Sequence, residues 1–90
     1  MTSRRTLKHD IKLICTDLFV ECIAVTLYGT PSEKEDAEAL MHTIVKMESN
    51  YVSRISHQEP GLPAKLYYRD LKRKFKANVT EIISQLNITE

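Results

Sequence analysis

The sequence predicts an all-α protein of three long antiparallel helices that run up, down and up, and that dimerisation completes. Three observations support this. Glycine and proline occur only near residues 29–31 and 60–63, which leaves three uninterrupted segments. Those segments carry apolar residues at spacings of three and four. No segment alternates polar and apolar residues as a strand does. The chain of 90 residues is thus one domain, 1–90, with helices over about 3–28, 32–57 and 63–87.

The composition is that of an ordinary folded chain. Hydrophobic residues make up 42 % and charged residues 28 % of the sequence, and this excludes extensive disorder. The net charge is +1, so any electrostatic preference has to come from local clusters. The longest apolar run, Leu18 to Tyr28, contains Glu21 and is shorter than the ~20 residues that span a bilayer. No membrane segment or secretory signal is expected.

The first predicted helix is apolar on two sides. At about 100° per residue, one face holds Leu7, Ile11, Ile14, Leu18, Cys22 and Val25. A second, roughly opposite face holds Leu13, Val20, Ala24 and Leu27, and Phe19 and Ile23 bridge the two. A helix that is apolar nearly all round should be buried nearly all round.

Two companion helices cannot easily cover both faces of such a helix. The second helix carries one apolar stripe from Leu40 to Ile55, and the third carries one from Tyr68 to Leu86. A large exposed apolar patch usually marks an interface, so we predict a twofold dimer. The alternative is a monomer in which the third helix crosses over to cover both faces. The predicted interface is Leu13, Phe19, Val20, Ile23, Ala24 and Leu27.

The first joint carries clear helix-capping signals. Gly29 suits a left-handed residue after a helix end, and Thr30, Pro31 and Glu33 fit the cap, the first turn and the last member of a capping box. The acidic cluster of this region comprises Glu33, Glu35, Asp36 and Glu38. Negative charge is favourable there because it lies at the positive end of the helix dipole. We therefore interpret this acidic cluster as a helix start rather than a metal site.

The second joint is expected to be stiff. Pro60 and Pro63 restrict the backbone on either side of Gly61, Gly61 suits a positive φ, and Pro63 can open the third helix. A rigid connector is the simpler interpretation. The alternative is a small ligand or peptide pocket, around which His57, Glu59, Lys65 and Tyr67 would gather.

A basic face on the third helix is the main alternative site. The basic residues Lys65, Arg69, Lys72 and Lys76 are spaced four, three and four, so they lie on one face of the helix. Tyr67 lies nearby and could stack on bases. Such a stripe can neutralise phosphates. Its long side chains can instead cover core edges or pair with the acidic cluster. The candidate interaction surface comprises Lys65, Arg69, Lys72, Arg73, Lys76, Tyr67, His57 and Glu59.

No pattern of catalytic or metal-binding residues is found. The three histidines are scattered, and the cysteines, Cys15 and Cys22, do not form a CxxC pair. Seven residues apart on a helix, these cysteines are too distant for a disulfide and are expected to be buried thiols of a reducing compartment. No enzyme activity, cofactor or metal is predicted.

The stretches RRTLKHDIKLICTDLFVEC and SHQEPGLPAKLYYRDL resemble a set of short, uncharacterised all-helical proteins of Bacteroides-type bacteria. The resemblance implies a freestanding bacterial, cytoplasmic protein and identifies no functional residues. The expected function is therefore that of a non-enzymatic scaffold, adaptor or regulatory subunit that binds itself and an unknown protein partner. The alternative is a nucleic-acid-associated accessory protein that uses the basic face.

Overall fold

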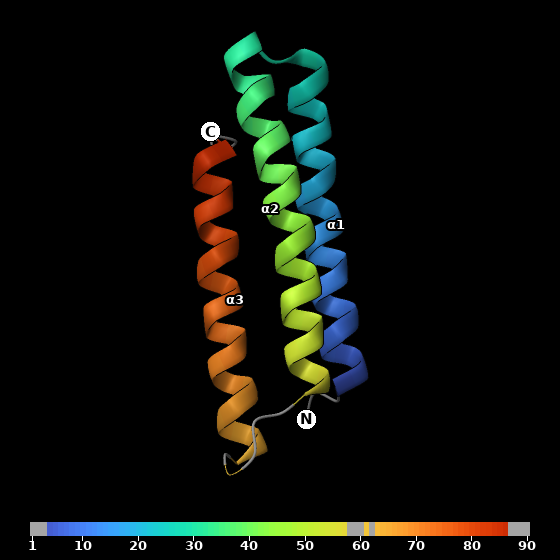
Figure 1. Cartoon of the computed structure of the whole chain (residues 1–90), viewed down its shortest axis with the longest axis vertical. Coiled ribbons are helices and arrows are strands. Elements are labelled where there is room, and N and C mark those ends of the chain that lie inside the picture. Colours follow the sequence, from blue (N-terminus) through green and yellow to red (C-terminus); the bar gives the residue numbers. More distant parts are fainter. Residues whose placement is uncertain (1–3, 58–60, 62, 87–90) are drawn as a thin grey trace.

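The computed structural model, which describes residues 4–57, 61 and 63–86, is an all-α bundle, as predicted. Three helices, α1 (Arg4–Tyr28), α2 (Pro31–Ser56) and α3 (Ala64–Leu86), run up, down and up along a rod of 48 × 20 × 20 Å (Figure 1). Each observed end lies within one residue of the predicted one, and the predicted ends at 3 and 87 lie outside the described residues. Within the described part of the chain, no helix is long and apolar enough to cross a membrane. Dimerisation stays a prediction.

The joint between α1 and α2 is short because its caps begin α2 at once. The Thr30 hydroxyl accepts a hydrogen bond from the Glu33 N–H at 3.2 Å, and the Glu33 Oε1 accepts one from the Thr30 N–H at 2.8 Å. With Pro31 at the first helical position, this is the predicted capping box. Glu33, the acidic residue in the first turn of α2, thus has the structural role expected of it.

The expected reason for Gly29 is wrong. Gly61 is the one described glycine with a positive φ, so Gly29 is not left-handed. Its N–H donates to the Val25 carbonyl at 2.8 Å, and a Cβ at position 29 would lie 2.7 Å from that same oxygen. Glycine is therefore required here by the close approach of two backbone segments rather than by a left-handed conformation.

The core lies between one face of α1, the stripe of α2 and part of α3. No described polar or charged residue is buried. Ile14, which the helical spacing placed on the inner face of α1, is a departure from the prediction because 40 % of its surface is exposed. It lies at the edge of that face, beside the groove towards α3. The buried residues are Leu7, Ile11, Cys15, Leu18, Cys22, Ala37, Leu40, Ile44, Met47, Tyr51, Ile55, Leu71, Phe75 and Ile82.

The third helix packs on α2, and hydrogen bonds help to hold it there. The Tyr67 hydroxyl donates to the Arg54 carbonyl at 2.9 Å, and the Tyr68 hydroxyl donates to the Ile55 carbonyl at 3.1 Å. These carbonyls belong to the last turn of α2, where no further turn of helix supplies N–H donors. The first turns of α3 are thereby tied to the end of α2.

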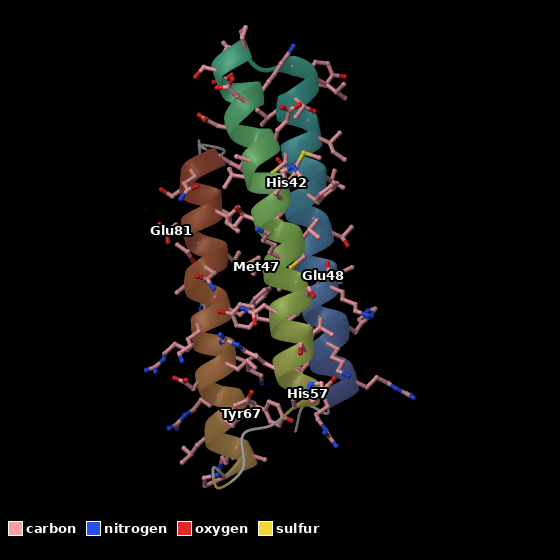
Figure 2. The ribbon with its side chains drawn as sticks, viewed as in Figure 1. His42, Met47, Glu48, His57, Tyr67 and Glu81 are labelled. Carbon is pink, nitrogen blue, oxygen red and sulfur yellow. The ribbon has the colours of Figure 1, made fainter. Side chains whose placement is uncertain are left out.

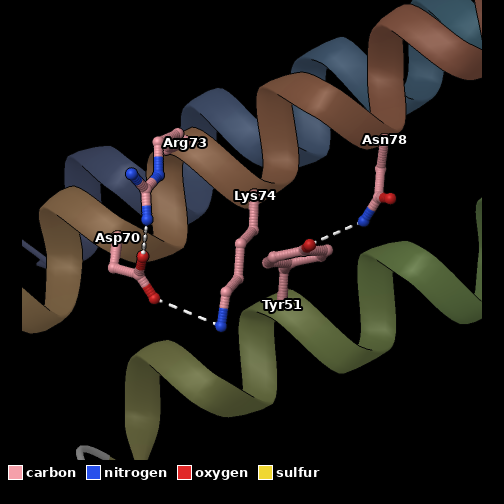
Figure 3. Close-up of polar contacts among 5 residues, drawn as sticks. All are labelled: Tyr51, Asp70, Arg73, Lys74 and Asn78. Atoms are coloured by element: carbon pink, nitrogen blue, oxygen red, sulfur yellow. Dashed lines mark hydrogen bonds and ion pairs between the residues drawn. The ribbon is translucent and has the colours of Figure 1, made fainter.

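A further polar contact joins the middle of the same two helices. The Tyr51 ring meets the Phe75 ring edge-on at 5.2 Å, and its hydroxyl accepts a hydrogen bond from Asn78 Nδ2 at 2.6 Å (Figure 3). Tyr51 thus buries its ring in the core and keeps its hydroxyl satisfied at the core edge.

The described part of the second joint agrees with the prediction. Gly61 has a φ of 86°. Pro63 directly precedes α3, and its carbonyl accepts a hydrogen bond from the Tyr67 N–H at 3.0 Å. Glu59 and Pro60, which the sequence predicts to belong to the same joint, lie outside the described residues.

Candidate functional site

Most of the exposed large hydrophobic residues in the described part of the chain lie on α1. We call the residues Leu13, Val20, Ile23, Ala24 and Leu27 on its outward face the outer stripe, and all five are exposed. The exposed fractions are 54 % for Leu13, 55 % for Val20, 38 % for Ile23 and 63 % for Leu27. Five of the six predicted interface residues thus form one surface.

Phe19 differs from the other predicted interface residues. It is half-buried and packs against the core cluster. A position about 100° round the helix from Val20 explains this, because it turns the ring towards the α1–α2 contact. Phe19 therefore borders the outer stripe rather than standing at its centre.

The arrangement of the helices leaves the outer stripe uncovered. The five buried residues of α1 point inwards at spacings of four, four, three and four, and the outer stripe lies on the opposite side. The third helix packs on α2 and borders α1 at two grooves. One is lined by Ile14, Leu18, Val79 and Ile83, and the other by Val25 and Leu86, among others. The outer stripe stays exposed, so α3 does not cross over to cover both faces of α1 in the described chain.

The predicted basic residues all lie on exposed surface of α3. One of them, Arg73, forms an ion pair with Asp70 at 2.5 Å, and Lys74 reaches the other oxygen of the same carboxylate at 3.2 Å (Figure 3). Hydrogen bonds from Lys74 and then from Arg73 lower the pKa of Asp70. Lys65, Arg69, Lys72 and Lys76 make no ion pair with a described residue.

The acidic cluster does not neutralise this basic face within one chain. Glu33 and its acidic neighbours lie in the first turns of α2, at the end of the rod where α1 ends. The basic residues lie in the first half of α3, which starts at the other end of the rod (Figure 1). Pairing between the two clusters would thus need a second molecule.

A groove between α2 and α3 gathers basic residues that sequence reasoning did not bring together. Arg54 of α2 lines it with Arg69, Arg73 and Lys74 of α3, and Asp70 is its one described acid. The Arg54 guanidinium also lies over the Tyr51 ring, 5.3 Å from its centroid. We call the groove lined by Arg54, Arg69, Arg73 and Lys74 the basic groove. Arg54 was missed because only the docking of α3 on α2 places it there.

The residues proposed to gather at the second joint do not share one pocket. His57 and Tyr67 lie at the same end of the bundle (Figure 2). The Nδ1 of His57 is 2.9 Å from the Ser53 carbonyl oxygen, and the ring lines a groove with Lys12 and Val45. Tyr67 lines the basic groove instead, with its hydroxyl bonded to Arg54. Lys65 is exposed, and Glu59 lies outside the described residues.

The cysteine thiols are packing groups in a protonated state. Both Cys15 and Cys22 are free and buried. Burial, with a smaller effect of Glu48, raises the pKa of Cys15 to about 11. Burial, with a smaller effect of Glu21, also raises the pKa of Cys22. A nucleophilic thiol needs the opposite environment, one that favours the thiolate.

The described histidines belong to no cluster of three or more metal-ligating side chains. Among the described residues, no group of three or more histidine, cysteine or acidic side chains could hold a metal ion. His42 and His57 both belong to the α2 segment and its cap, but lie well apart along the rod (Figure 2).

Comparisons of this chain with protein-family models, with curated proteins and with solved structures found no significant match. The resemblance to short helical proteins of Bacteroides-type bacteria stays a prediction. Function therefore has to be inferred from the outer stripe and the basic groove.

Proposed function

We propose that this chain is a non-enzymatic helical interaction protein, a scaffold, adaptor or regulatory subunit, that associates with itself through the outer stripe of α1. The supporting observation is the exposure of Leu13, Val20 and Leu27, each more than half exposed, on one side of one helix. Single exposed apolar residues are ordinary on protein surfaces, but a contiguous row of them typically marks a contact site.

The size of the stripe suits a reversible dimer. Fully burying a Leu, Val or Ile side chain contributes about 1.5–3 kcal/mol. The large residues of the stripe are already about half buried, so each contributes about half of that on association. Two copies together would gain about 6–12 kcal/mol, which is comparable with the estimated cost of association of about 4–15 kcal/mol. The largest gain set against the smallest cost leaves about 8 kcal/mol, which corresponds to a dissociation constant of about 1 μM. We therefore expect a concentration-dependent dimer that forms at micromolar or higher concentration rather than an obligate one.

The test compares two valines of nearly equal exposure. Val20 in the outer stripe is 55 % exposed, and Val45 on α2 is 57 % exposed. Light scattering and sedimentation should show a dimer for the wild type and for Val45→Glu, and a monomer for Val20→Glu. Circular dichroism should show the same helix content in all three. A wild-type chain that stays monomeric well above micromolar concentration would refute the proposal.

The proposed setting is the bacterial cytoplasm. The two free thiols are consistent with a reducing compartment, where structural cysteines stay unpaired. This part of the proposal also depends on the resemblance described above.

A second candidate function is binding of nucleic acid or another polyanion. It is favoured by the basic groove, where four cations from two helices face one carboxylate. Fluorescence anisotropy with short single-stranded and duplex DNA should then show affinity that falls with salt. Arg54→Glu should weaken it, whereas Glu81→Gln, on a different groove, should not. A flat titration at low salt would exclude this function.

A further inference from the structure

We infer that two copies of this chain pair with their α1 helices parallel and in register, and that charged residues beside the outer stripe set this orientation. The inference depends on the proposed self-association. It commits to a second copy as the occupant of the stripe, and it is argued from the positions and charges of exposed residues on α1.

The outer stripe has the spacing of a coiled-coil seam. Leu13, Val20 and Leu27 are seven residues apart, with Thr16 and Ile23 between them at spacings of three and four, and all five are exposed. A repeat of seven residues keeps one narrow row of side chains facing a partner helix when the two helices wrap around each other. A second α1 is a partner with the same repeat.

Opposite charges flank this seam on its two sides. Lys12 lines a groove with α2, and Asp17 lines a groove with α3. Arg5 and Asp10 each precede one of them by seven residues, so they lie on the same two sides of the seam. All four are exposed, and none makes an ion pair with another described residue. Glu48 of α2 lines the same groove as Lys12 without pairing with it. The charges are therefore available to a partner.

A parallel pair brings the opposite charges together. In a parallel, in-register coiled coil, the flanking residue on one side of the seam meets the residue five positions later on the other side of the partner. Lys12 then faces Asp17 of the second copy, and Arg5 faces Asp10 of the second copy. By symmetry each contact occurs twice.

An antiparallel pair loses these contacts. The Leu13–Val20–Leu27 row is symmetric about Val20, so an antiparallel pair centred there would also bury it well. However, residues 12 and 17 would then face the uncharged segment from Ile23 to Tyr28 of the partner. The apolar row thus favours association, and the charges decide between the two orientations.

Disulfide trapping distinguishes the orientations. In the parallel pair the two copies of residue 16 face each other, so Thr16→Cys should form a disulfide dimer under mild oxidation while the buried wild-type thiols do not. In the antiparallel pair the two copies of residue 16 are about 12 Å apart along the axis, too far for a disulfide. If the pair is antiparallel, residue 16 faces residue 24 of the partner. A mixture of Thr16→Cys and a mass-tagged Ala24→Cys chain would then form a mixed disulfide dimer instead.

Charge reversal gives an independent readout. Lys12→Glu places like charges opposite each other in the parallel pair and should weaken the dimer about tenfold, as expected from two exposed pairs. Adding Asp17→Lys to the same chain should restore the affinity. Sedimentation measures both changes, and high salt should diminish them.

Disulfides between copies of residue 16, together with rescue by the double charge swap, would support the parallel pair. A dimer that traps only the mixed 16–24 disulfide, or that is insensitive to the charge swap, overturns the parallel orientation and leaves the proposed function intact. A chain that is monomeric throughout overturns both.

Discussion

The two helical hairpins of this protein are held together by different means. The α1–α2 hairpin turns in the two residues Gly29 and Thr30 and joins α1 to α2 through buried apolar side chains such as Ile11, Cys15 and Ile44. The α2–α3 hairpin has a longer joint, fewer buried residues on its third helix, and side-chain hydrogen bonds that cross between the helices.

This difference indicates two sources of order. Burial of apolar surface stabilises α1 on α2 without strict directional demands. The hydroxyl groups of Tyr51, Tyr67 and Tyr68 fix where α3 lies along α2, because a hydrogen bond tolerates little change in distance or angle. The outward faces of the two helices show the same contrast. The outer stripe makes α1 apolar on two sides, whereas α3 has a charged outer face.

The largest expected effect comes from removing a buried methyl-rich side chain from the first hairpin. Ile11 is 2 % exposed, so Ile11→Ala should lower the free energy of unfolding by about 2–5 kcal/mol, a large share of the total for a small domain. Urea unfolding measures it. The control Val45→Ala, on exposed surface, should change stability by less than about 0.5 kcal/mol. Equal effects of the two variants would contradict the packing described for α1.

A somewhat smaller decrease in the free energy of unfolding is expected at high pH, and it again arises in the first hairpin. The pKa of Cys15 is raised from 9.0 to about 11, so the unfolded chain loses this proton before the folded one does. Stability is therefore complete below about pH 9 and falls as the pH rises towards 11, by up to about 3 kcal/mol at about 1.4 kcal/mol per pKa unit. The raised pKa of Cys22 acts in the same direction.

Unfolding titrations at several pH values test this, with a variant in which both cysteines are replaced by alanine as the reference. The wild type should lose more stability than the reference between pH 9 and 11, because only its thiols differ. Parallel pH profiles would show that the thiols ionise as freely in the folded state as in the unfolded one.

The smallest decrease in the free energy of unfolding is expected from substitutions in the second hairpin. Tyr67→Phe and Tyr68→Phe each remove one hydroxyl hydrogen bond to the end of α2 and should cost about 0.5–1.5 kcal/mol apiece. Amide hydrogen exchange should speed up in the first turns of α3 while that of α1 stays unchanged. Tyr28→Phe is the matched control, since Tyr28 is 87 % exposed. Uniform acceleration across all three helices would argue against a local role.

Much of the fold was predictable because its signals are local. The capping box of Thr30 and Glu33 fixes the start of α2 through residues only three apart, and the inner face of α1 follows from helical spacing. The sequence predicts a glycine-dependent joint at Gly29 but not the reason for the glycine. Its requirement depends on the distance to the Val25 carbonyl, which only the closed turn defines.

The site was predictable to the extent that it lies on one helix. The outer stripe follows from the spacing of Leu13, Val20 and Leu27 along α1. The basic groove could not be foreseen, because Arg54 comes from a different helix from its three partners and is placed by the docking of α3. Likewise, the sequence could show that Tyr67 and Tyr68 are amphipathic but not that their hydroxyls bond to the end of α2.

The proline at the start of α2 also restricts how copies of this chain could assemble. A helical hairpin with a two-residue turn can in principle straighten into one continuous helix and exchange an arm with another molecule, which is a common route to domain-swapped dimers. Pro31 opposes such straightening, because inside a continuous helix its ring would clash with the carbonyl of Leu27 and one N–H donor would be missing, at a cost of about 3 kcal/mol. Arm exchange is therefore disfavoured, and copies of this chain are expected to meet as closed hairpins and to separate again without unfolding.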